Sequence, residues 1–242
     1  MTSSESTLNY QAFLPKTALV EKIISLGNEI NAGRVIDLGC GQGVDAIYLQ
    51  QRTGWFVVGV DNSMEKLGRV SNKISKCNWD VTTPISAELT QYDIGYASFL
   101  VHLLSAHQKS MFYRNCATLI RPGGIFVCLT ASVEDLKRRT IAQYFPSALG
   151  IDLKRYKSVE WNCLKLRSVG FDKIFTESIT LGGSNRNVNI NYYRDKRFSI
   201  LNLISENEFT KGLGQMIYDH GQKQLKHPSV WARTLIIAKR SD

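Results

Sequence analysis

Two aspartates and a run of glycines are the residues of this 242-residue chain whose types and spacing point most directly to chemistry. Asp37 stands just before the turn Gly39-Cys40-Gly41-Gln42-Gly43, and Asp61 ends the apolar run 57–61. A carboxylate at Asp37 would repel a pyrophosphate and attract an ammonium group. Asp61 can accept hydrogen bonds from both hydroxyls of a ribose. Together they predict a ligand in which a nucleoside is joined to an amino acid.

A βαβ unit is the local structure that would position these groups. The run 34–38 is typical of a short buried strand, residues Val44 to about Thr53 have helical spacing, and 57–61 is typical of a second strand. Ligands of parallel α/β sheets bind at the carboxyl ends of the strands, where the glycine turn falls. The turn differs from the dinucleotide pattern G-x-G-x-x-G because Val44 takes the place of the third glycine. Two plainer interpretations stay open: a tight connection without a ligand, and a helix N-cap role for Asp61.

The order and spacing of further motifs resemble those of the class I S-adenosylmethionine-dependent methyltransferases, specifically their small-molecule group. Residues 35–43 resemble the first motif of that family and residues 59–63 the second. Asp80-Val81 is similar to the position that holds the adenine amino group. Residues 92–99 are similar to the fourth strand of the family, and residues 119–126 to the turn into its fifth strand. The resemblance implies S-adenosyl-L-methionine as the cofactor. Its expected contacts are Asp37, Gly39, Cys40, Gly41, Gly43, Asp61, Asn62, Asp80, Val81, Ala97 and Ser98. An alternative for Asp80 is that it only starts a turn.

The rest of the pattern, with the resemblance, predicts a doubly wound α/β fold. It should have a mainly parallel seven-stranded sheet, helices on both faces and an antiparallel last strand. Helical spacing is found at 14–30, 63–75, 108–119, 133–143 and 158–169, and strand-like runs at 124–130, 172–179 and 233–238. Because 242 residues with 43% hydrophobic content can bury a substantial core, and α/β domains of this size often form one unit, residues 1–242 are expected to form a single domain, with 1–33 as an N-terminal helical cap.

A long insertion, Leu181 to Val230, separates the last two predicted strands. It far exceeds an ordinary hairpin connection of roughly 2 to 5 residues. It begins with Gly182-Gly183 and has a helical pattern from about Phe198 to Ile217. Loops on a rigid α/β scaffold commonly provide binding and closure, so we interpret residues 181–230 as a lid over the acceptor. The alternative is a docked helix that protects a sheet edge, or an oligomer contact.

Catalysis in the family that this chain resembles depends mainly on positioning. A methyl group on a sulfonium is already a strong electrophile, so the acceptor atom must be held in line at about 3 to 3.5 Å. If a general base is needed, His102 is the candidate, because it follows the fourth strand and imidazole titrates near neutral pH. Its apolar surroundings also fit a histidine without a catalytic role. The candidates for acceptor contacts are His102, Tyr10, Tyr192 and Tyr193, with His220 and His227 as further lid candidates and His107 as a helix-start residue.

The chain carries a formal net charge of +9, with basic clusters at 137–139, 154–157 and 194–197. Such clusters neutralise phosphates in nucleic-acid-binding proteins, but more often they are solvated helix faces. The turn at 97–100 lacks the Pro-Pro-aromatic sequence that methyltransferases of exocyclic base amines often carry. We therefore expect a small acceptor, and an acidic one would explain the charge. The alternatives are a nucleic-acid or protein methyltransferase and a non-catalytic S-adenosylmethionine-binding protein.

The sequence pattern favours a cytoplasmic protein with no membrane partner. No apolar run approaches the roughly 18 to 20 residues of a membrane helix. Residues 1–9 are polar and lack the basic start and apolar run of a secretory signal. The five cysteines never form a C-x-x-C pair, so we expect no metal site.

Overall fold

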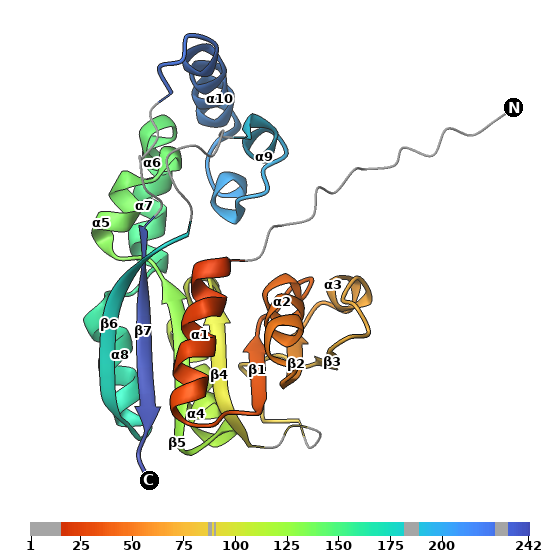
Figure 1. Cartoon of the computed structure of the whole chain (residues 1–242). Helices are drawn as coiled ribbons and strands as arrows, with labels where there is room; N and C mark the ends of the chain where they lie inside the picture. Colours follow the sequence, from red (N-terminus) through yellow and green to blue (C-terminus); the bar gives the residue numbers. More distant parts are fainter. Residues whose placement is uncertain (1–15, 87–88, 90, 182–188, 226–231) are drawn as a thin grey trace, which may run out of the picture.

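A seven-stranded sheet forms the centre of the molecule (Figure 1). The computed structural model describes residues 16–86, 89, 91–181, 189–225 and 232–242. The strand order is β3-β2-β1-β4-β5-β7-β6. The strands are β1 Arg34–Leu38, β2 Phe56–Asp61, β3 Ser75–Asn78, β4 Tyr92–Ser98, β5 Ile120–Thr130, β6 Phe171–Thr180 and β7 Ala232–Arg240. Neighbours from β3 to β5 are parallel, whereas β7 is antiparallel to both β5 and β6. The predicted fold class is confirmed.

The chain reverses its direction across the sheet between β1 and β4, and folds of this kind bind ligands at such a point. From β1 the chain moves outward to β2 and β3, then returns to β4 on the other side of β1. β1 and β4 are paired with Asp37 opposite Tyr96. The carboxyl ends of these two strands therefore carry the glycine turn and the turn after β4.

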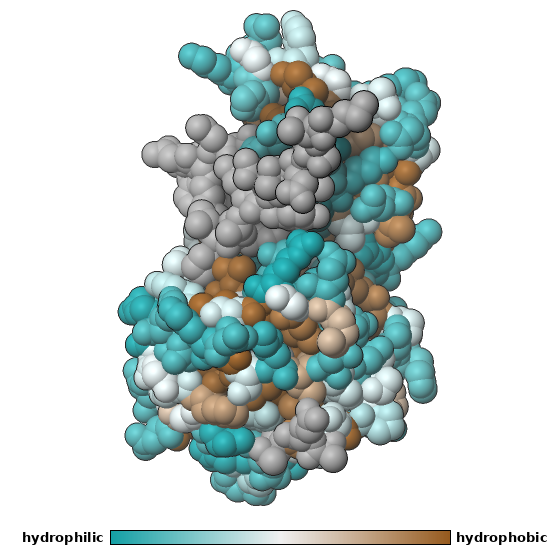
Figure 2. Space-filling view, turned by 90° about the vertical axis from the view of Figure 1, so that its right-hand side faces the viewer, coloured by the Kyte–Doolittle hydropathy of each residue, from teal (hydrophilic) through white to brown (hydrophobic). Residues whose placement is uncertain are grey.

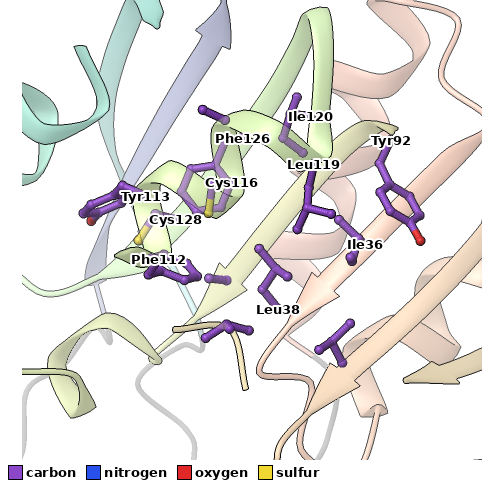
Figure 3. Close-up of a cluster of buried hydrophobic side chains, with 14 of the residues drawn as sticks. Ile36, Leu38, Tyr92, Phe112, Tyr113, Cys116, Leu119, Ile120, Phe126 and Cys128 are labelled. Atoms are coloured by element: carbon purple, nitrogen blue, oxygen red, sulfur yellow. The ribbon is translucent and has the colours of Figure 1, made fainter. Parts of the chain in front are cut away.

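Both faces of the central strands β1, β2 and β4 are buried, which explains why these strands are almost continuously apolar, whereas the edge strands β3 and β6 are largely exposed. Successive residues point to opposite faces, so Val35 belongs to one hydrophobic cluster and Ile36 to the other. The first face is covered by α1 (Thr17–Glu29) and α2 (Val44–Thr53), the second by α4 (Ala106–Leu119) and α8 (Val159–Ser168). Figure 3 shows part of the second cluster, with Phe112 and Cys116 of α4. No helix within the described ranges is long and apolar enough to cross a bilayer.

A smaller lobe, hereafter the cap, lies beyond the carboxyl ends of the parallel strands (Figure 1). It consists of α6 (Thr140–Tyr144), α7 (Pro146–Arg155), α9 (Ile190–Arg194), the 3-10 helix η2 (Ser199–Asn202) and α10 (Glu206–Gly221). Its buried cluster includes Phe145 and Phe209, whose rings stack with centroids 6.0 Å apart. The Tyr144 hydroxyl donates to Asp219 at 2.8 Å. In the space-filling view the cap stands above the sheet domain, and hydrophilic residues cover much of both (Figure 2). The cap thus joins two chain segments, one before and one after β6.

Three predicted helices differ from the observed ones. The helix expected at 63–75 is only α3 (Met64–Gly68), because Ser75 already begins β3, which pairs with β2. The helix expected at 133–143 breaks at Arg139, whose backbone is extended, so that α5 (Val133–Arg138) and α6 are separate. The helix expected from Phe198 begins at Glu206, after η2. Helix α7 has no counterpart in the sequence prediction.

Candidate functional site

The glycine turn between β1 and α2 is anchored to β2 through its backbone. The amides of Gly39 and Cys40 both donate to the last-but-one carbonyl oxygen of β2 at 2.8 Å. Gly39 has a φ of 78°, and a Cβ at this position would lie 2.9 Å from the Leu100 side chain. Gly41 and Gly43 also adopt positive φ angles. The glycine at position 39 therefore lets the turn after β4 approach the turn after β1.

Asp61, at the end of β2, is buried and links the glycine turn to the segment that follows. Its Oδ2 accepts from the Gly41 amide at 2.9 Å, and its Oδ1 accepts from the Ser63 amide at 2.9 Å. The N-cap of α3 is Ser63, whose Oγ accepts from the Lys66 amide, so capping is not the role of the Asp61 side chain. Each carboxylate oxygen can accept more than one hydrogen bond. These contacts therefore leave capacity for two ribose hydroxyls.

Asp37, at the end of β1, is buried close to a second acid. Its Oδ2 accepts a hydrogen bond from the Tyr96 hydroxyl at 2.9 Å. Burial, and then the negative charge of Asp45, raise the pKa of Asp37 to about 8. Asp45 is itself paired with Lys16, whose ammonium nitrogen lies 2.6 Å from Oδ2. The carboxyl group of Asp37 is therefore mostly protonated at neutral pH unless a cation comes near it.

Asp80 starts a turn, as the alternative interpretation of this residue predicts. Its Oδ1 accepts from the backbone amide of Thr82 at 2.8 Å and from the Thr82 hydroxyl at 2.7 Å. Val81 is buried, and its carbonyl oxygen accepts from the Asn115 side chain at 2.8 Å. A carboxylate has a second oxygen, so this turn is compatible with an adenine contact. The adenine contact stays a prediction.

The turn after β4 combines backbone strain with an unsatisfied hydroxyl. Phe99 has a φ of 53°, a left-handed conformation that residues other than glycine rarely adopt. Ala97 is buried, and the buried Ser98 Oγ has no hydrogen-bond partner in the part of the chain that the structure describes. Backbone strain concentrates at functional sites, and buried hydroxyls normally have partners. The turn is therefore a good candidate for ligand contact.

His102 lies in the short 3-10 helix η1 (Val101–Leu103) and contacts the end of α7. Its ring stacks on that of Tyr156, with centroids 4.3 Å apart and an interplanar angle of 5°. Burial, and then the charges of Arg155, Arg139 and Lys109, lower the pKa of His102 to about 3. Such a shift does not favour His102 as a general base, and a catalytic role for this residue stays a prediction. The ring is neutral near pH 7 and is a weak base.

The other predicted acceptor contacts lie in different environments. Tyr193 is buried in the cap, with its ring centroid 5.0 Å from that of Phe198. Tyr192 is half-buried, and the Arg197 guanidinium lies 4.7 Å from its ring centroid. Of the remaining candidates, Asn62, His107 and His220 are exposed, while Tyr10 and His227 lie outside the described residues.

Two arginines between the sheet and the cap are not among the sequence-based site candidates. Asp152 of α7 pairs with Arg139 at 2.6 Å and lies 3.6 Å from Arg155, which also donates to Ser199 of η2 at 3.1 Å. The side chains of Arg139 and Arg155 are only 16% and 17% exposed. The interpretation of their basic clusters as solvated helix faces is therefore wrong for these two residues. The local signals for them are the basic clusters themselves and the i, i+3 spacing of Asp152 and Arg155.

Known proteins share both part of this sequence and its fold. Residues 35–124 match the family model described as "Methyltransferase domain". No curated protein sequence shows significant similarity to the chain. The structure is similar to that of an Anabaena variabilis protein whose name assigns it to the methyltransferases of an antibiotic biosynthesis pathway. The two share 18% identity with a TM-score of 0.71, over 93% of this chain and 98% of that one.

Two further solved structures are similar at lower scores. One is an S-adenosylmethionine-dependent methyltransferase from Archaeoglobus fulgidus, with a TM-score of 0.56 and 16% identity over 93% of this chain and 92% of that one. The other is Haemonchus contortus phosphoethanolamine N-methyltransferase 2 in complex with phosphomonomethylethanolamine and S-adenosylhomocysteine. Its TM-score is 0.57 and its identity 13%, over 92% of this chain and 53% of that one. At these identities the likeness shows the fold.

Proposed function

We propose that the chain is a class I S-adenosylmethionine-dependent methyltransferase whose methyl acceptor is a small molecule; the match of residues 35–124 to a methyltransferase domain and the shared fold support the first part. The observation that carries the proposal is the stack of His102, just after β4, on Tyr156, at the end of α7. This contact joins the sheet to the cap on the side from which an acceptor would approach, whereas a polymer would need that side to be open. Arg139 and Arg155 are largely buried there and do not form an exposed basic surface. The Haemonchus contortus protein of similar fold is named for a small phosphorylated acceptor.

The described residues fit S-adenosylmethionine in three respects. Asp61 keeps hydrogen-bonding capacity for ribose hydroxyls beside the Gly41 amide. Asp37 has a raised pKa that the ammonium group of the cofactor would lower. The Ser98 hydroxyl is buried and takes no hydrogen bond from the described residues. Bound here, the cofactor would supply an electrophilic methyl group on a sulfonium.

The contribution of the chain itself is mainly to position the reactants. The turns after β1 and β4 meet at Gly39 and Leu100, so groups that hold the cofactor and groups that face the acceptor are fixed relative to each other. Tyr156 fixes the plane of the His102 ring. Since the pKa of His102 is lowered to about 3, its neutral ring orients the acceptor by a hydrogen bond and is not a strong base. Alignment of this kind supplies a large share of the rate in many enzymes.

The proposal is tested by incubating the protein with S-adenosylmethionine labelled in the transferred methyl group and an extract of small metabolites. We expect a labelled product of low mass, identified by mass spectrometry. Asp61→Ala is the matched control and should form little of the same product, because it loses the ribose contacts. Label on RNA or protein would contradict the proposal. Cofactor binding without any labelled product would instead favour a non-catalytic binding protein.

A further inference from the structure

The region between the sheet and the cap holds more positive than negative charge. Arg139 and Arg155 share the carboxylate of Asp152, at 2.6 and 3.6 Å. Arg233, in β7, acts electrostatically on Arg139 and on Asp135. The Asp135 Oδ2 already accepts hydrogen bonds from the backbone amide of Ser132 and from the Thr234 hydroxyl, both at 2.9 Å. Among the described residues, three guanidinium groups therefore act on two carboxylates, one of which, Asp135, already accepts two other hydrogen bonds.

These cations repel one another. Burial, and then the charge of Arg139, lower the pKa of Arg233. Burial, and then the charges of Lys157 and Arg155, lower the pKa of Lys109 to about 8. Cations held together at a free-energy cost are typical of sites that bind an anion.

The same cations surround the predicted acceptor side of the site. Tyr156, which stacks on His102, lies within the electrostatic reach of Arg139, Arg155 and Arg233. His102 is two residues from Leu100, which contacts the glycine turn at Gly39. Arg155 belongs to the cap and Arg139 directly precedes its helix α6, and their charges act on both His102 and Tyr156.

Building on the proposed function, we propose that Arg139, Arg155 and Arg233 bind an oxyanion, a carboxylate or a phosphate, that the methyl acceptor carries. The planar guanidinium fork matches the two oxygens of either group, and hydrogen bonds between two charged partners are the stronger ones. Asp152 holds Arg139 and Arg155 in place before any ligand arrives, which reduces the entropy lost on binding. The proposal also gives a reason why Arg139 and Arg155 are largely buried although they share a single carboxylate.

The first test measures binding of two simple probes to the full chain by calorimetry: inorganic phosphate and acetate, at an ionic strength fixed with sodium chloride. We expect saturable binding of at least one probe, and the preferred probe tells a phosphate from a carboxylate. Arg155→Gln should weaken binding by about tenfold or more, because it removes a charged hydrogen-bond donor. This variant leaves Asp152 paired with Arg139. Lys154→Gln removes an exposed charge from the neighbouring position and should bind like the wild type.

Arg233→Gln is the second variant and should weaken probe binding in the same way, whereas Arg138→Gln, at an exposed position, should not. S-adenosylmethionine affinity should stay unchanged in all four variants, which also shows that they are folded. The oxyanion proposal is overturned if neither probe binds, or if the buried and exposed variants bind a probe equally. A labelled product without an anionic group would overturn it too, while leaving the small-molecule proposal intact. Absence of any labelled product would count against the small-molecule proposal, and the probe titrations would still decide whether the arginines bind an oxyanion.

Discussion

The affinity for S-adenosylmethionine should rise with pH because of Asp37. This carboxyl group is buried near Asp45, and its pKa is raised to about 8. Below that pH the ligand-free protein keeps a proton on Asp37. An ammonium group nearby favours the charged carboxylate, so cofactor binding should release this proton. The affinity therefore increases as the pH rises toward 8.

The expected magnitude follows from the number of protons released. When one proton leaves on binding, the dissociation constant falls about tenfold per pH unit, or about 1.4 kcal/mol, so we expect this change between pH 6 and pH 7. Asp37→Asn carries no titrating proton and should show a flat profile. Tyr96→Phe removes the hydrogen bond that lowers the pKa of Asp37, so the rise in affinity should move to higher pH.

Calorimetry at both pH values, in two buffers of different ionisation enthalpy, measures the affinity and the protons released. The control ligand is 5′-methylthioadenosine, which contains the nucleoside without the amino-acid part, and its affinity should not follow Asp37. The reasoning is refuted if wild-type affinity is the same at pH 6 and pH 7 with no proton released. It is also refuted if Asp37→Asn keeps the wild-type slope.

Three further predictions concern stability, the ribose contact and the cap. The pKa of Asp37 is near 3.8 in the unfolded state and about 8 in the native state. Between these pH values the native state binds more protons, so the free energy of unfolding should fall as the pH rises from 3.8 to 8. Urea unfolding of the wild type should show this fall, and urea unfolding of Asp37→Asn should show a smaller one. Asp61→Ala should weaken S-adenosylmethionine binding in calorimetry by roughly 1.5 to 3 kcal/mol. Ser63→Ala removes the side-chain hydrogen bond at the N-terminus of α3 and should leave this affinity nearly unchanged. Equal affinities of Asp61→Ala and the wild type would count against the ribose contact. A Cβ at Gly212 would lie 2.4 Å from a backbone oxygen of α6, while one at Gly214 meets nothing within 4 Å. Gly212→Ala should therefore lower turnover more than cofactor affinity, and Gly214→Ala should lower neither. Wild-type turnover in a folded Gly212→Ala variant would argue against a role for the cap in the reaction.

The half of the candidate site near β1 and β2 could be predicted from the sequence because its determinants are local. The positive φ angles of Gly39, Gly41 and Gly43 strongly favour glycine, and the sequence shows glycine at those positions. Asp61 follows directly from the end of a recognisable strand. The structure adds what spacing does not encode, namely that Tyr96, across the β1–β4 pair, holds the Asp37 carboxyl group.

The cap could not be predicted from local sequence patterns because its core joins segments that are far apart in the chain. Glu208 of α10 accepts hydrogen bonds from the backbone and hydroxyl groups of Ser147, 61 residues earlier. Arg139 has an extended backbone and pairs with Asp152, and neither feature is visible in the spacing of the apolar residues. Residues of the insertion therefore form one lobe together with α6 and α7. The prediction that residues 181–230 form a lid by themselves does not include this packing. Its role as an acceptor lid stays a prediction.

Methyl transfer to a small anionic acceptor is tested most directly by measuring which molecules receive the labelled methyl group. Whole-cell lysate, incubated with the protein and S-adenosylmethionine labelled in the methyl group, is passed through a membrane that retains macromolecules. We expect that label beyond the no-enzyme background appears in the filtrate as a new compound that carries a negative charge, and that S-adenosylhomocysteine forms in equal amount. Label retained with RNA or protein, or no transfer in a lysate that supports cofactor binding, would contradict this expectation.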